Sequence, residues 1–149
     1  MKLYIAYGSN LNVEQMKYRC PTAKLVGTGT LENCILDFRC MFSLAFATIH
    51  PKEGHYVPVA YWEIDRTAEY TLDVYEGYPR FYDKQLLPIT KDGKTQNALI
   101  YVMNELATPG LPSRSYVQTI YKGYLDVGLN VKDLEKICEN CGFSLRDML

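Results

Sequence analysis

The order of the predicted secondary-structure elements constrains the fold of this sequence more than any other feature. Apolar patterns and turn signals predict strands at residues 2–6, 25–31, 34–40, 44–49, 56–64, 82–90 and 97–104. Only one helical pattern interrupts this series after residue 25, whereas parallel α/β folds alternate strands with helices. The sequence therefore predicts an α+β fold, in which about six strands curl into a small β-barrel and helices pack outside it.

Helix start and stop signals are clear in the sequence. Asn12, Ser113 and Asn130 are favourable N-caps, and Gly77 and Gly128 are typical helix-ending glycines. Helices are therefore predicted at about residues 12–18, 66–76, 113–128 and 130–138. Turns are expected at residues 50–54 and 91–94. With 149 residues and no linker or repeat, the chain is predicted to form one domain, residues 1–149.

The composition argues against several classes of partner. A net charge of −1 with no basic run is not typical of a protein that binds nucleic acid or an anionic membrane surface. No stretch approaches the roughly 18 apolar residues of a membrane span, and the first strand is too short for a signal peptide. Five scattered cysteines argue against a disulfide framework and fit a reducing, cytoplasmic location.

The first strand runs directly into Tyr7-Gly8-Ser9-Asn10, and a helical pattern follows. A glycine at such a junction lets the backbone approach a ligand closely. Free N–H groups of the turn, with the helix N-terminus behind them, suit a carboxylate or a developing oxyanion, and Ser9 and Asn10 add polar side chains. The alternative is an ordinary tight turn that Ser9 or Asn10 caps.

A glutamate falls on the apolar face of the helix predicted at residues 66–76. Ala68, Leu72 and Tyr75 share one face at helical spacing, and Glu76 follows Leu72 by about one turn. Burial disfavours a charged carboxylate, so the pKa of Glu76 is expected to rise toward the neutral range that suits a general base. Alternatively, Glu76 lies in a fraying last turn and points to water.

Several short motifs occur together in an order and spacing that one family shares. They are Tyr7-Gly8-Ser9-Asn10-Leu11, Arg19-Cys20-Pro21, Ala47-Thr48-Ile49, Tyr75-Glu76-Gly77 and Pro112-Ser113-x-x-Tyr116. In these motifs the sequence resembles the γ-glutamylcyclotransferase family, including its AIG2-like relatives. The resemblance implies a small mixed β-barrel with flanking helices, a pocket at one end of the barrel, and chemistry that needs no metal and no organic cofactor.

The resemblance also implies a reaction on a small γ-glutamyl substrate. The substrate's α-amine attacks its own γ-carbonyl, which expels an amine and leaves 5-oxoproline. The glutamate of the family corresponds to Glu76, which is proposed to take a proton from the attacking amine and return one to the departing nitrogen. The glycine-containing loop of the family corresponds to residues 7–11. Backbone N–H groups around Gly8 could stabilise the oxyanion or hold the substrate's α-carboxylate.

Two tyrosines and one lysine complete the expectations from the resemblance. Tyr82 and Tyr116 correspond to phenols that line the family's pocket, although each could equally be a packing tyrosine. Lys84 stands where many relatives carry arginine. It keeps the charge and lacks the bidentate fork, so a role in binding a substrate carboxylate is not expected. The resemblance leaves a homodimer open.

Two other functions stay open on the sequence alone. The same chemistry could remove a γ-glutamyl protecting group from a specialised metabolite, or the barrel could bind a small metabolite without catalysis. Glu76 argues against a mere binder, because a carboxylate on an apolar face costs stability. Other chemistry has weaker support. Cys138-x-x-Cys141 falls at a predicted helix C-terminus, and His50 and His55 have no partner at metal-ligand spacing.

Overall fold

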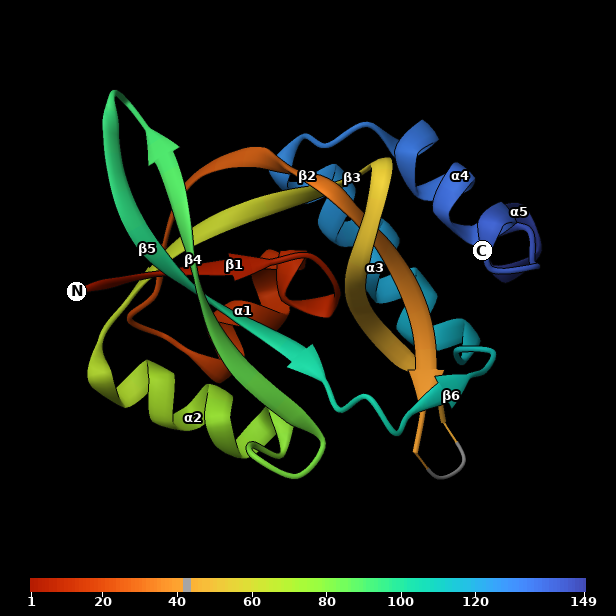
Figure 1. The fold of residues 1–149 in the computed structure, drawn as a ribbon, viewed down its shortest axis with the longest axis horizontal. Helices are drawn as coiled ribbons and strands as arrows, with labels where there is room; N and C mark the ends of the chain where they lie inside the picture. The colour runs from red at the N-terminus through yellow and green to blue at the C-terminus, as the bar shows by residue number, and fades with distance from the viewer. Residues whose placement is uncertain (42–43) are drawn as a thin grey trace.

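The computed structural model describes residues 1–41 and 44–149, and its strands form one curled sheet (Figure 1). The strands are β1 (Lys2–Ala6), β2 (Lys24–Cys40), β3 (Phe46–Ile64), β4 (Tyr82–Lys91), β5 (Lys94–Met103) and β6 (Thr108–Pro109). Their order is β4-β5-β1-β3-β2-β6, and β1 and β5 run parallel while the other neighbours are antiparallel. The predicted α+β fold with a mixed sheet is confirmed. The edge strands β4 and β6 are not paired with each other, so the curled sheet is a half-barrel and not a closed barrel.

Helices flank this sheet, as the sequence predicts. They are η1 (Ser9–Leu11, a 3-10 turn), α1 (Val13–Arg19), α2 (Arg66–Glu76), α3 (Arg114–Val127), α4 (Val131–Asn140) and α5 (Leu145–Met148). The predicted N-caps form: Asn12 Oδ1 accepts from Gln15 N–H, and Ser113 Oγ accepts from Tyr116 N–H. Figure 1 shows α3 and α4 beside the β2–β3 hairpin and α2 beside the start of β4, while α5 packs against α3 and α4.

The prediction of a chain-reversing turn at residues 50–54 is wrong. Strands β2 and β3 pair along almost their whole length, and residues 52–55 of β3 bulge out opposite Asn33 alone. Asn33 and Gly54 both have positive φ, at 56° and 83°, and the Gly54 N–H donates to Asn33 Oδ1 at 3.2 Å. The residues with turn propensity therefore form a bulge and do not reverse the chain, because β3 pairs with β2 on both sides of it.

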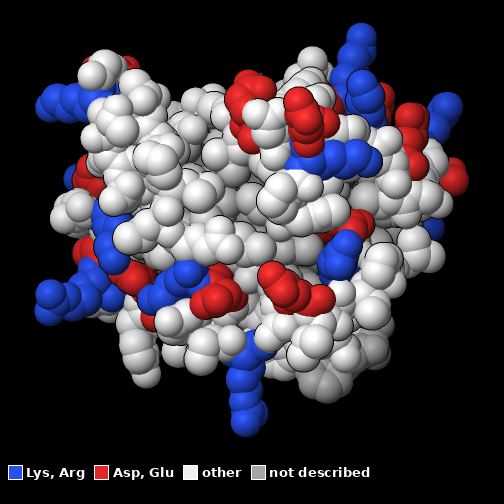
Figure 2. All heavy atoms as spheres, viewed as in Figure 1, with Lys and Arg blue, Asp and Glu red and all other residues white. Residues whose placement is uncertain are grey.

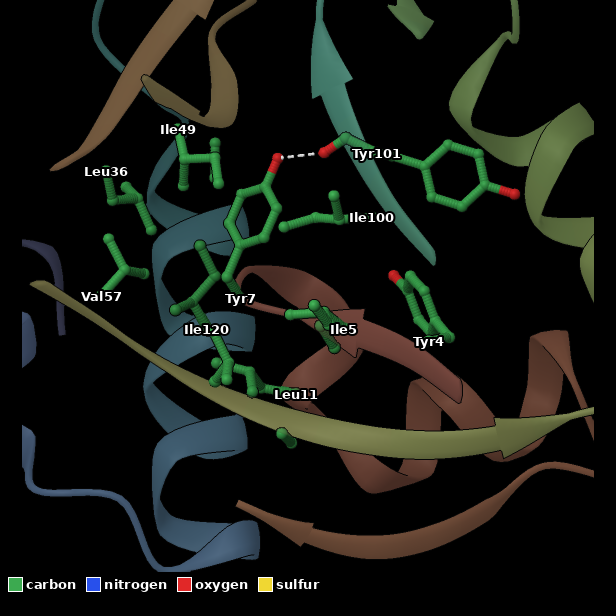
Figure 3. Packing of buried hydrophobic residues seen from close by; sticks show 14 of the residues in the cluster. Tyr4, Ile5, Tyr7, Leu11, Leu36, Ile49, Val57, Ile100, Tyr101 and Ile120 are labelled. Atoms are coloured by element: carbon green, nitrogen blue, oxygen red, sulfur yellow. Dashed lines mark hydrogen bonds between the residues drawn. The ribbon is translucent and has the colours of Figure 1, made fainter. Parts of the chain in front are cut away.

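The core lies between the curled sheet and α3. Ile5, Val57 and Ile100 come from three neighbouring strands, and each is completely buried. Ile120 of α3 lies among them, as Figure 3 shows. Residues 57–62 of β3 are all buried, which confirms the prediction that this strand is covered on both faces. The sheet is thus a rigid support for the residues at its ends.

Charges of both signs cover the surface. Figure 2 shows Lys and Arg interspersed with Asp and Glu, with uncharged residues between them, over the face seen in Figure 1. The described residues on that face gather into no large patch of one sign. Among residues 1–41 and 44–149, no helix is long and apolar enough to span a membrane.

Candidate active site

A cavity of about 560 Å³ lies at one end of the curled sheet, in the size range of small-molecule sites. It forms where β1, β2 and β5 end and β3, β4 and α3 begin, with the last turn of α2 as a further wall. The described residues that line it are Tyr4, Tyr7, Gly8, Ser9, Asn10, Arg39, Cys40, Met41, Leu44, Phe46, Ala47, Val74, Tyr75, Glu76, Gly77, Phe81, Tyr82, Tyr101, Met103 and Tyr116.

Glu76 is the last residue of α2 and lines this cavity. Ala68 and Leu72, on the same side of the helix, are 3% and 0% exposed. Burial raises the pKa of the Glu76 carboxyl to about 7, while the positive charge of Arg19 opposes that rise. The expected inward position and raised pKa of Glu76 agree with the structure, and its catalytic role stays a prediction.

Tyr75 differs from the expectation, because 48% of it is exposed. Helix α2 ends at Gly77, which adopts the left-handed conformation with φ at 66°. The last turn of the helix lines the cavity. There the Tyr75 ring packs under the guanidinium of Arg19, whose central carbon lies 3.1 Å from the ring centroid. Tyr75 therefore forms part of the cavity wall and not of the buried helix face.

Gly8 connects β1 to η1 and allows a close contact between three elements. A Cβ at this position would lie 3.3 Å from Ala47 Cβ and 3.4 Å from the Tyr116 hydroxyl. The lack of a side chain at Gly8 therefore provides the space for this close approach. Ser9 and Asn10 follow as the first residues of η1, whose leading N–H groups have no partner within the helix.

Asn10 holds the loop rigidly. Its Nδ2 donates to the Tyr4 hydroxyl at 2.9 Å, and its Oδ1 accepts from Arg19 Nη1 at 2.5 Å. Its main-chain carbonyl accepts from Trp62 Nε1 at 3.1 Å. Because the side chain is 3% exposed and both its ends have protein partners, Asn10 fixes the backbone that faces the cavity. The Ser9 hydroxyl is held more loosely, because within the described part of the chain its one hydrogen bond is the 3.4 Å bond that it accepts from Arg19 Nη1.

The three tyrosines predicted to lie in the site line the cavity, and the hydroxyl of each forms a hydrogen bond with a backbone group. Tyr7 donates to the Tyr101 carbonyl at 2.6 Å, as Figure 3 shows, and Tyr82 donates to the Ala47 carbonyl at 2.6 Å. Tyr116 differs, because its oxygen accepts from the Ala47 N–H at 3.0 Å. Burial raises the pKa of all three phenols, so they stay neutral. Tyr116 thus keeps its own proton available for a ligand.

Leu11 is the one predicted site residue that the structure does not bring to the cavity. It is completely buried and lies against Gly123 of α3, where an added Cβ would come within 2.7 Å of Leu11 Cβ. Figure 3 shows it beside Ile120. The turn of η1 directs successive side chains to different sides, so Leu11 points into the core while Ser9 and Asn10 line the cavity.

Comparison with known proteins identifies the family of the chain. Residues 4–120 match the family model described as "Gamma-glutamyl cyclotransferase, AIG2-like". The chain belongs to this family. The gamma-glutamylcyclotransferase of Homo sapiens is 28% identical over 144 residues, which cover 91% of this chain and 76% of that protein. The protein of the same name from Bos taurus is 28% identical over 145 residues, with the same coverage.

A solved structure named gamma-glutamyl cyclotransferase superposes with a TM-score of 0.81 at 27% identity. The match covers 91% of this chain and 85% of that one. The resemblance stated from the motifs is thereby confirmed, together with the fold that it implies. As a member of the gamma-glutamyl cyclotransferase, AIG2-like family, the chain is an enzyme of the cyclotransferase type.

Arg19 is a component of the site to which the sequence assigns no role. Its guanidinium donates to Ser9 and Asn10 in η1 and stacks on Tyr75 in α2, so it joins the two halves of the site. The only sequence signal was its place in the Arg19-Cys20-Pro21 motif of the cyclotransferase family. Contacts between residues this far apart along the chain have no periodic signature, so spacing alone could not reveal this role.

Lys84 lies outside the cavity lining and anchors α2 to β4. Its ammonium donates to Glu69 Oε2 and Asp73 Oδ2, both at 2.9 Å, and lies 4.5 Å from the centroid of the Tyr78 ring. Asp73 also accepts from the Tyr101 hydroxyl at 2.6 Å. The expectation that Lys84 does not bind a substrate carboxylate fits this arrangement, because its hydrogen bonds connect protein groups.

Cys138 and Cys141 lie at the C-terminal end of a helix, as the sequence predicts. Cys138 falls in the last turn of α4, and Cys141 follows the helix. Burial raises the pKa of the Cys138 thiol to about 12 and that of Cys141 to about 11, so neither favours the reactive thiolate. Among the described residues, no group of three or more His, Cys, Asp or Glu side chains could hold a metal ion.

Proposed function

We propose that the protein converts a γ-glutamyl amine or γ-glutamyl amino acid to 5-oxoproline and the free amine, with Glu76 as general acid and base. The single observation that carries the proposal is the Glu76 carboxyl, with its pKa raised to about 7, in a cavity faced by the η1 loop. A base of this pKa accepts a proton near neutral pH and can return it in the next step.

The reaction begins with the substrate's α-ammonium group. Glu76 takes one of its protons, and the neutral amine attacks the γ-carbonyl carbon to close a five-membered ring. The tetrahedral intermediate then collapses: the bond from the γ-carbon to the leaving nitrogen breaks, and Glu76 gives its proton to that nitrogen. The attacking nitrogen loses a second proton as the lactam forms, and the released amine takes up a second one. The ammonium charge of the substrate thus leaves with the product amine, and atoms and charge balance without a co-reactant.

The negative charge of the intermediate needs hydrogen-bond donors that are already in place. Backbone N–H groups at Gly8, Ser9 and Asn10 are candidates, since η1 does not use its first N–H groups internally. The uncommitted proton of the Tyr116 hydroxyl lies next to Gly8 and is a further candidate. One of these donors would hold the oxyanion and another the α-carboxylate of the glutamyl group.

Rigidity of the cavity supports an intramolecular reaction. A correctly folded substrate already contains both reactants, so holding it in a reactive conformation provides much of the acceleration. Asn10 pins the η1 loop, and Ala47 is held between the hydroxyls of Tyr82 and Tyr116. These hydrogen bonds fix the walls of the cavity before substrate binds.

The test is turnover of a panel of γ-glutamyl amino acids and amines, with 5-oxoproline measured by mass spectrometry. Glu76→Gln keeps the shape of the side chain and removes the base, so kcat is expected to fall by about 10²- to 10⁴-fold. Glu135→Gln makes the same substitution on the exposed side of α4 and serves as the matched control. The proposal fails if no member of the panel yields 5-oxoproline, or if Glu76→Gln turns over as fast as the wild type.

A further inference from the structure

Two charged side chains line the cavity among the described residues, and they come from different walls. Glu76 belongs to the last turn of α2, and Arg39 lies near the end of β2. The ends of α2 and β2 lie apart in Figure 1. A ligand that fills the cavity therefore meets a carboxyl at one wall and a guanidinium at another.

Arg39 is held in place and keeps part of its guanidinium for a ligand. Its Nε donates to Asp37 Oδ2 at 3.0 Å, and its Nη1 donates to the Ala107 carbonyl at 3.3 Å. Its Nη2 has no acceptor among the described residues, and the side chain is 28% exposed. A guanidinium fixed at two of its nitrogens presents its remaining N–H groups in a defined direction, which suits a planar carboxylate.

The proposed reaction determines which part of the substrate can reach Arg39. The α-amine and the γ-carbonyl must both lie beside Glu76, and the glutamyl carboxylate is bonded to the same carbon as the amine. The leaving group is the part that can extend away from Glu76. Arg39 and Met103 also line a larger groove, of about 1210 Å³, between the β2–β3 and β4–β5 hairpins, so Arg39 borders both spaces.

We propose that Arg39 is a specificity-determining residue that binds a carboxylate on the leaving amine. This inference rests on the proposed function and narrows its substrate class. The preferred substrates are γ-glutamyl amino acids, whose leaving nitrogen stands next to a free carboxylate, over γ-glutamyl amines that have none. Asp37 acts as a positioning residue, because it accepts from Arg39 Nε and from the Phe38 N–H and so fixes the guanidinium.

The experiment compares two substrates that differ only at that group, γ-glutamyl-alanine and γ-glutamyl-alaninamide. Arg39→Gln is expected to lower kcat/KM for γ-glutamyl-alanine by about 10- to 100-fold, the usual effect of losing a charge-assisted hydrogen bond. For the amide, the change is expected to stay below about threefold. Differences in the intrinsic reactivity of the two substrates cancel, because each is measured on both enzymes.

Two further variants make the comparison specific. Arg39→Lys keeps the charge and loses the fork, so its loss on γ-glutamyl-alanine is expected to be intermediate. Arg66→Gln removes an exposed arginine that lines neither cavity and is expected to leave both substrates unaffected. An equal loss on both substrates with Arg39→Gln would overturn the inference, since Arg39 would then act on the glutamyl part or on folding. Unchanged kinetics on both would overturn it as well.

A binding measurement separates this inference from the proposed function. Titration calorimetry of γ-glutamyl-alanine against Glu76→Gln and against Glu76→Gln/Arg39→Gln requires no turnover. A Kd about 10-fold weaker in the double variant supports the role of Arg39, and an equal Kd contradicts it. A wild-type protein that produced no 5-oxoproline would refute the proposed function, while this titration would still decide the role of Arg39.

Discussion

Two glutamates on α2, at its two ends, have opposite electrostatic environments. Glu69, in the first half of the helix, accepts from Lys2 at 2.7 Å and from Lys84 at 2.9 Å. Burial acts to raise the pKa of Glu69, but hydrogen bonds and charge from the two lysines outweigh it and lower the pKa. Glu76, at the other end, is partly buried at the cavity, where desolvation raises its pKa to about 7.

The difference shows how one helix serves stability at one end and chemistry at the other. The first two turns are held by ion pairs to β1 and β4, so the helix is a fixed support. The last turn carries a carboxyl whose burial is not compensated by a hydrogen bond within the described residues. Such a group destabilises the folded protein when it is ionised, and that cost is typical of active sites.

The largest expected effect is on turnover. Glu76→Gln is expected to lower kcat by about 10²- to 10⁴-fold, whereas Glu69→Gln should change it by less than about threefold, because only Glu76 lines the cavity. Steady-state assays of 5-oxoproline release on both variants measure the contrast. Similar losses in the two variants would mean that the whole helix, and not the carboxyl at its end, determines activity.

The two glutamates should also affect stability with opposite signs. The pKa of Glu76 rises from an ordinary 4.5 to about 7 on folding, so its contribution to stability is present below pH 4.5 and is lost as the pH rises through 7. Glu76→Gln is therefore expected to raise the free energy of unfolding at pH 8 by about 1–3 kcal/mol and to change it little at pH 4.

Glu69→Gln is the matched control for this stability measurement. The lowered pKa of Glu69 means that its contribution is present above the unfolded pKa and is lost as the pH falls through the folded one. The substitution should therefore destabilise the protein by about 1 kcal/mol at pH 8 and have little effect at pH 3. Urea denaturation at these pH values measures both variants. A Glu76→Gln protein less stable than the wild type at pH 8 would contradict an uncompensated buried carboxylate.

Removing the anchor of α2 should have a smaller effect. Lys84→Met takes one partner from Glu69 and one from Asp73, and is expected to cost about 1–2 kcal/mol of unfolding free energy. Lys84→Arg keeps the charge and should cost less than half as much. Thermal melts measure stability, and kcat is expected to fall only a few-fold in Lys84→Met, since Tyr101 still holds Asp73. If Lys84→Arg is as unstable as Lys84→Met, the ion pairs are not what anchors the helix.

Local signals in the sequence predicted the bounds of α2 and the side of the helix on which Glu76 lies. The helix begins after Asp65, whose side chain accepts from the Ala68 N–H, and it ends at Gly77. Caps and stop residues act over a few neighbouring positions, so the range Arg66–Glu76 could be predicted without the fold. The inward side of Glu76 followed from the same helical periodicity.

Contacts between distant segments account for the features that were missed. The segment 50–54 has turn residues, yet pairing with β2 on both sides keeps β3 continuous, since a long ladder overrides local preference. Arg19 reaches Asn10 in the preceding turn and Tyr75 in another helix, and no periodic pattern marks such a bridge. The core position of Leu11 depends on its packing against α3, which the motif alone does not reveal.

The smallest expected effect concerns Arg19 and its influence on the pKa of Glu76. Lysines lower the pKa of Glu69 through direct hydrogen bonds, whereas Arg19 acts on Glu76 through its charge alone and only partly offsets the effect of burial. Arg19→Gln should therefore raise the pKa of Glu76 further and shift the acidic limb of the kcat/KM profile to higher pH by less than about one unit. Arg19→Lys keeps the charge and should leave the limb in place, even if the lost hydrogen bonds to Ser9 and Asn10 weaken substrate binding. A limb that moves to lower pH, or moves equally in both variants, would show that the charge of Arg19 does not set the ionisation of Glu76.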